Sequence, residues 1–107
     1  MKFQHQILAD GRWQTLSLAE QLGNIGSEVH RAHKAEKTNE NRFLAARDRA
    51  LELFDLTLAD PRWRGRLREI ARAQEVFCDA TLGGELYGST LENLEKYFDQ
   101  FALAARR

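Results

Sequence analysis

The chain has 107 residues, 43% of them hydrophobic and only one of them proline, which is enough for one folded domain and excludes a disordered tail. Its 16 Lys and Arg residues balance 16 Asp and Glu residues, and this zero formal charge excludes a global electrostatic attraction to nucleic acid or membranes. The single cysteine excludes an internal disulfide, and no signal-like or membrane-spanning apolar run occurs, so we expect a cytoplasmic protein without a membrane partner.

Residues 2–16 are expected to form a short β-hairpin. Apolar and polar residues alternate before Asp10-Gly11. Asp-Gly is a typical two-residue hairpin turn, because both of its residues must tolerate a positive φ. An isolated hairpin is only marginally stable, so Trp13 is expected to pack on the helices or on another subunit.

A first helix is predicted to begin at Ser17. Ser17 and Glu20 have the spacing of a capping box, in which each side chain accepts a hydrogen bond from the other residue's backbone. Gly23 and Gly26 share one face of this helix, although each costs about 1 kcal/mol relative to alanine. We therefore expect a close helix–helix contact there, within the bundle or between subunits. The core positions follow a three-and-four spacing: Leu18, Leu22, Ile25, Val29 and Ala32.

Two long helices are predicted over residues 42–82, with cap candidates for the first of them at residues 38–41. Asp60 can cap the second helix, and Pro61 suits its first position while it ends the helix before. A turn this tight makes the two helices antiparallel neighbours. If the handedness brings the charged flanks together, equal travel from the turn predicts a ladder of interhelical ion pairs. The pairs are Asp55 with Arg64, Glu52 with Arg68, and Asp48 with Arg72.

The last helix is predicted to follow a stop at Gly83-Gly84 and to begin near a second capping box, Ser89 to Glu92. Together these elements predict an all-α fold. It is an antiparallel four-helix bundle over residues 17–105 with a short N-terminal β-hairpin over residues 2–16, in a single domain of residues 1–107.

Several apolar side chains lie outside the predicted core stripes of their helices. These side chains, a glycine-lined helix and zero net charge favour self-association, so we expect a homo-oligomer. The candidate interface residues are Trp13, Gly23, Gly26, Leu53, Leu56, Val76 and Tyr97.

An arginine-rich segment at the start of the third helix is the strongest candidate for ligand binding. Guanidinium groups match phosphate geometry, and a helix N-terminus attracts anions. The competing interpretation is that Trp63 belongs to the core and that the arginines pair with carboxylates. The candidate nucleic-acid-binding residues are Arg62, Arg64, Arg66, Arg68 and Arg72.

Catalytic and metal sites have weaker signals. His30 and His33 lie three residues apart on one helix face, but a zinc site needs three or four converging ligands and no other Cys or His completes the set. Cys78 is a lone thiol, which is more typical of core packing than of a nucleophile. We expect no metal, no cofactor and no enzymatic activity. The alternative is a small hydrolase or nuclease that uses His30 and His33, or Cys78.

Three stretches resemble a known family: residues 22–28 (Leu-Gly-Asn-Ile-Gly-Ser-Glu), 42–44 (Arg-Phe-Leu) and 50–53 (Ala-Leu-Glu-Leu). They are similar to the Asn-Ile-Ala-Glu-Gly, Arg-Phe-Leu and Gly-Ser-Leu-x-Glu-Leu stretches of the four-helix proteins encoded in ribosomal-RNA intervening sequences. The accessory variability determinants of diversity-generating retroelements are relatives of these proteins. The resemblance implies a pentameric helical barrel with nucleic acid or a reverse transcriptase as partner.

The sequence thus predicts a non-enzymatic, oligomeric helical adaptor that binds a protein partner. RNA or DNA is a candidate ligand of its arginine-rich helix start. A purely structural helper or an antitoxin-like partner is a further alternative.

Overall fold

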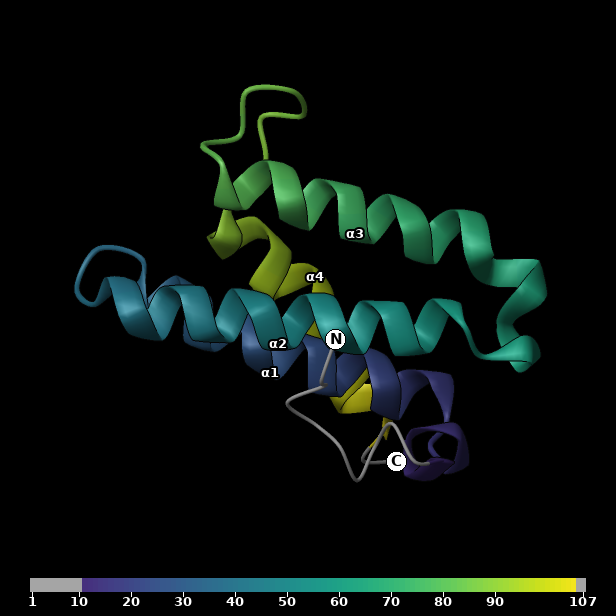
Figure 1. Ribbon diagram of the computed structural model, residues 1–107. Helices are drawn as coiled ribbons and strands as arrows, with labels where there is room; N and C mark the ends of the chain where they lie inside the picture. The colour runs from purple at the N-terminus through teal and green to yellow at the C-terminus, as the bar shows by residue number, and fades with distance from the viewer. Residues whose placement is uncertain (1–10, 106–107) are drawn as a thin grey trace.

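The computed structural model describes residues 11–105, and within this range the chain forms four α-helices, two 3₁₀ helices and no strand (Figure 1). In chain order they are η2 (Trp13–Thr15), α1 (Leu18–Ala35), α2 (Glu40–Leu58), η3 (Pro61–Arg66), α3 (Leu67–Thr81) and α4 (Leu91–Ala105). The predicted all-α bundle is therefore confirmed for the described residues. Among them, no helix is both long enough and apolar enough to cross a lipid bilayer.

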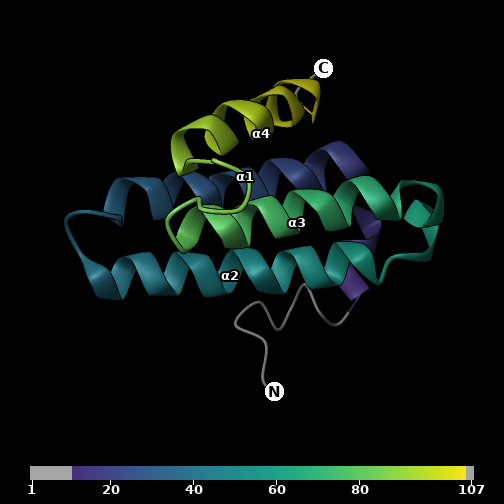
Figure 2. The same ribbon diagram turned by 90° about the horizontal axis from the view of Figure 1, so that it is seen from above.

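Helix α1 is the central element of the bundle. It packs along both α2 and α4, and α2 also packs against α3, whereas α3 and α4 contact each other less extensively than these three pairs do (Figure 2). The Phe54 ring of α2 lies 5.9 Å from the Phe77 ring of α3 and 6.0 Å from the Phe98 ring of α4. These three buried rings join three helices in one hydrophobic core.

The predicted N-terminal β-hairpin is not supported. Its first part, residues 1–10, lies outside the described residues, and Trp13–Thr15 form a 3₁₀ turn where the second strand was expected. Gly11 does have a positive φ of 110°, as a turn requires. Tertiary contacts decide the conformation of Trp13, because its ring is fully buried and its indole Nε1 donates a 3.1 Å hydrogen bond to Thr57 Oγ1.

Helix α1 begins with the capping box that the sequence predicts. Ser17 Oγ accepts from the Glu20 backbone at 3.1 Å, and Glu20 Oε1 accepts from the Ser17 backbone at 2.9 Å. The two glycines face α4 of the same chain. A Cβ at Gly26 would lie 2.7 Å from Phe98 Cβ, and one at Gly23 would lie 3.4 Å from Ala102 Cα. Of the two expected contacts, the structure therefore forms the one within the bundle.

The connection between α2 and α3 is longer than predicted. Asp60 caps a 3₁₀ segment, Trp63 has non-helical φ and ψ of −103° and 21°, and the α-helix begins only at Leu67. This shifts the register of the two helices, so Asp55 accepts a hydrogen bond from Gln74. The predicted pair of Asp55 with Arg64 is therefore wrong.

The predicted pair of Asp48 with Arg72 is also wrong, for the same reason. Asp48 instead pairs with its neighbour Arg47 at 3.2 Å.

The expectation that Leu53 and Leu56 project away from the core is also wrong. Their side chains are buried, with exposed fractions of only 2% and 7%. Helix α2 packs against both α1 and α3, so its buried face is wider than the single stripe read from the sequence.

Candidate functional site

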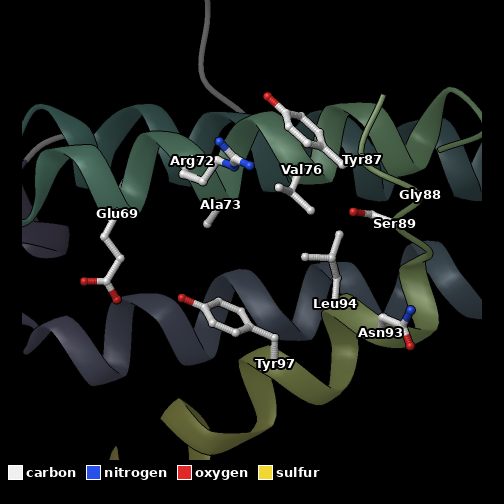
Figure 3. Close-up of a pocket in the computed structure, with 10 residues that line it drawn as sticks. All are labelled: Glu69, Arg72, Ala73, Val76, Tyr87, Gly88, Ser89, Asn93, Leu94 and Tyr97. Carbon is white, nitrogen blue, oxygen red and sulfur yellow. The ribbon is translucent and has the colours of Figure 1, made fainter. Parts of the chain in front are cut away.

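A cleft of about 440 Å³ lies between α3, α4 and the loop of residues 82–90 that connects them. Its apolar wall consists of Ala73 and Val76 from α3 and Leu94 and Tyr97 from α4, with Tyr87 from the loop. Figure 3 shows Val76 and Leu94 pointing toward each other across the cleft. We refer to this site as the α3–α4 cleft.

Asp79 holds the loop that borders the α3–α4 cleft. This carboxylate is only 6% exposed, and it accepts hydrogen bonds of 3.0 Å from the backbone N–H groups of Leu86 and Tyr87. Gly84 makes the tight return possible, since it has a φ of 76° and a Cβ there would lie 2.5 Å from the Ser89 carbonyl oxygen. The loop is therefore held by the end of α3 and not only by its own turns.

Polar groups lie at the rim of the cleft. The Tyr87 hydroxyl donates a 3.1 Å hydrogen bond to Glu75, and the Arg72 guanidinium carbon lies 4.4 Å from the centre of the Tyr87 ring. Burial and the carboxylate of Glu69 raise the pKa of Tyr97, so its phenol is neutral at physiological pH and able to donate a hydrogen bond. The cleft thus combines an apolar wall with a few oriented polar groups at its rim, which is the usual composition of a binding site.

The cleft brings together two of the predicted interface residues, Val76 and Tyr97. The other five are used inside the described chain: Trp13, Leu53 and Leu56 are buried, while Gly23 and Gly26 contact α4. The sequence contained no signal for the cleft itself, because its walls come from two helices whose separation depends on the whole bundle.

Three of the five arginines predicted to bind nucleic acid have side-chain partners within the chain. Arg66 pairs with Glu69 at 2.9 Å, Arg72 lies over the ring of Tyr87, and Arg62 binds Asp60. The remaining two, Arg64 and Arg68, are exposed, and their side chains have no hydrogen-bond or ion-pair partner among residues 11–105.

A buried polar network at the α2–η3 corner was not predicted. Gln21 is fully buried, and its Nε2 donates to Trp13 O at 2.9 Å and to Asp60 Oδ2 at 3.1 Å. Its Oε1 accepts a 2.9 Å hydrogen bond from Trp63 Nε1. One glutamine therefore links η2, α1 and the corner. Its neighbours in the sequence do not reveal this role, because every partner lies eight or more residues away.

Asp60 is the charged member of this network and is only 1% exposed. The Arg62 side chain donates three hydrogen bonds to its carboxylate, the shortest of 2.7 Å, and another to the Leu16 carbonyl oxygen. These bonds outweigh the effect of burial and lower the pKa of Asp60 from 3.8 to about 2. Asp60 and Arg62 therefore serve the architecture of the corner.

The groups proposed for catalysis are also engaged. His30 and His33 on α1 each contact one oxygen of the Glu95 carboxylate on α4, the second at 2.7 Å. Burial raises the pKa of Glu95, but the hydrogen bonds from the two histidines outweigh it, and the pKa lies below its ordinary value. Burial raises the pKa of the Cys78 thiol, which keeps it protonated at neutral pH.

Within residues 11–105, no group of three or more His, Cys, Asp and Glu side chains is placed to hold a metal ion. A comparison of the chain with family models, with curated proteins and with solved structures finds no match. The resemblance to the intervening-sequence family therefore stays a prediction.

Proposed function

We propose that this chain is a non-enzymatic helical adaptor that self-associates through the α3–α4 cleft. The observation that carries the proposal is the meeting of Val76 and Tyr97 with Leu94 in one cleft. Two of these side chains were expected at an interface from the sequence alone. A protein partner would then bind to the assembled oligomer rather than to the isolated chain.

A second copy of the chain suits the α3–α4 cleft because the molecule carries a matching projection beside it. Leu86 is 83% exposed and directly precedes Tyr87, which lines the cleft. In a twofold interface, the Leu86 side chain of each copy can enter the cleft of the other, so one surface supplies both projection and recess. The chain has zero formal charge and offers little electrostatic resistance to this contact.

Light scattering coupled to size-exclusion chromatography tests this proposal. One chain has a mass of 12.3 kDa, and we expect a species of twice that mass or a higher multiple at micromolar concentration. Leu86→Ser should weaken self-association by about tenfold or more, because burial of a leucine side chain contributes about 1.5–3 kcal/mol. Tyr97→Ala should act in the same direction.

Leu103→Ser is the matched control, because Leu103 is 60% exposed on α4 but does not line the cleft. It should leave the measured mass unchanged. A monomer at all concentrations would refute self-association. Equal losses in Leu86→Ser and Leu103→Ser would place the contact outside the α3–α4 cleft.

A further inference from the structure

A groove between α1 and α2 concentrates positive charge that the total composition conceals. It has a volume of about 650 Å³ and lies beside the loop that joins the two helices. Arg31, Lys34, Arg42 and Arg49 line it, and no acidic residue does. We refer to it as the α1–α2 groove. None of its residues is shared with the α3–α4 cleft.

Two of the four cations are held in place by one buried carboxylate. Glu28 is only 2% exposed, and its two oxygens accept from Arg31 Nη1 at 2.6 Å and from Arg49 Nε at 3.0 Å. Each guanidinium uses one nitrogen for this carboxylate, so most of its N–H donors stay available to a ligand. The buried carboxylate therefore orders two arginines that come from different helices and line the groove.

The other two cations have no such counter-charge. Lys34 and Arg42 are exposed and have no hydrogen-bond or ion-pair partner through their side chains in the described part of the chain. The four positive groups of the groove are thus paired with only one carboxylate, that of Glu28, in a molecule whose formal net charge is zero. Zero net charge excludes a global field, but it does not prevent a local one of this kind.

We propose that the α1–α2 groove binds the phosphate backbone of a nucleic acid. Arg42 and Arg49 are seven residues apart on α2, which is about 10 Å along the helix axis. That length corresponds to roughly three phosphate-to-phosphate steps along one strand, at about 3.4 Å of rise each, which exceeds the reach of a single small anion.

The groove has no aromatic side chain in its lining, so it offers no surface on which a base can stack. Its contacts are cationic groups together with the amides of Asn39 and Asn41. Such a surface reads the charge and spacing of the backbone and not the order of the bases. Binding is therefore independent of sequence and weakens steeply as salt is added.

Fluorescence anisotropy with labelled single-stranded and double-stranded oligonucleotides at 50–200 mM salt tests this site. The double variant Lys34→Ala/Arg42→Ala should lose about tenfold or more in affinity at 50 mM salt. Its plot of log affinity against log salt should be shallower by about 2, because two phosphate contacts are removed. Both side chains are exposed and have no partner within residues 11–105, so the melting temperature should not change, which circular dichroism verifies.

The comparison variant is Arg64→Ala/Arg68→Ala, which removes two exposed cations from the competing candidate site at the start of α3, both without a side-chain partner within residues 11–105. This variant should bind within about twofold of the unmodified chain. Absence of binding at 50 mM salt, or equal losses in the two double variants, would overturn the proposal. Displacement of the oligonucleotide by tripolyphosphate at equal phosphate concentration would identify a small polyphosphate as the ligand of the groove. That result would also overturn the proposal.

Discussion

At the scale of single residues, Asp60 shows how one side chain can serve several contacts. It caps η3 by accepting from the Arg62 backbone at 3.0 Å, it binds the Arg62 guanidinium, and it accepts from the buried Gln21 amide. A cap residue is visible in the sequence because capping is local. The partnership with Gln21 is not visible, because 39 residues separate the two side chains.

The lowered pKa of Asp60 predicts an acid-dependent loss of stability. Its folded pKa of about 2 lies below the ordinary 3.8, so its contribution is complete above pH 4 and is lost as the pH falls toward 2. We expect Asp60→Asn to lower the free energy of unfolding by about 1–2 kcal/mol at pH 7, a value reduced because Arg62 is partly exposed. By pH 3 the difference between the two proteins should shrink to about half.

Urea unfolding at pH 7, 4 and 3 measures this difference. Glu69→Gln is the control, because Glu69 forms a surface pair with Arg66 in which both side chains are about half exposed. Such a pair contributes about 0–1 kcal/mol, so its removal should matter less at pH 7. A pH-independent gap between Asp60→Asn and the unmodified chain would show that the charge of Asp60 does not stabilise the fold.

At the scale of elements, the contact between α1 and α4 depends on two positions without side chains. Gly23 and Gly26 let the two backbones approach, and the sequence predicted a close helix contact for this reason. The sequence could not say which helix forms it, since any helix with a small or flat face can meet a glycine-lined one. The longer corner between α2 and α3 is the opposite case, because Asp60-Pro61 predicted a helix start that Trp63 interrupts.

Two glycine substitutions separate close packing from backbone freedom. Gly26→Ala should destabilise the protein by about 1–3 kcal/mol, because its new Cβ would lie 2.7 Å from Phe98 Cβ in the core. Gly65→Ala meets nothing within 4 Å, so it should be neutral or stabilise by up to about 1 kcal/mol. Thermal and urea unfolding measure both variants. If Gly26→Ala were as stable as Gly65→Ala, α4 would not pack on α1 at this distance.

At the scale of the whole molecule, the helices are not equally supported. α1 packs along both α2 and α4. α4 packs along α1 but contacts α3 much less, and the α3–α4 cleft lies between these two helices. The cleft and the α1–α2 groove share no residue, so a self-associated form would keep one free groove per copy. The proposed oligomer and the proposed nucleic-acid site are therefore compatible and can be tested separately.

This uneven support predicts the order of local opening. Backbone amides of α4 should exchange with solvent through openings of lower free energy than those of α1, because α4 packs extensively on one helix only, whereas α1 packs extensively on two. Native-state hydrogen exchange followed by mass spectrometry measures this order, and Gly26→Ala should enlarge the difference. Equal protection of α4 and α1 would contradict it and would indicate that the bundle opens as one unit.

By itself, the sequence determined where α1 and α2 begin and which face of α1 is buried. Ser17, Asn39 and Asp60 act on backbone groups within three residues, and apolar periodicity follows from the helix repeat, so both signals are local. Only the tertiary structure decided the register across the α2–α3 corner, the partner of the glycine face and which cations stay unpaired. These features depend on contacts between distant segments, such as Gln21 with Asp60, and on how closely whole helices approach one another.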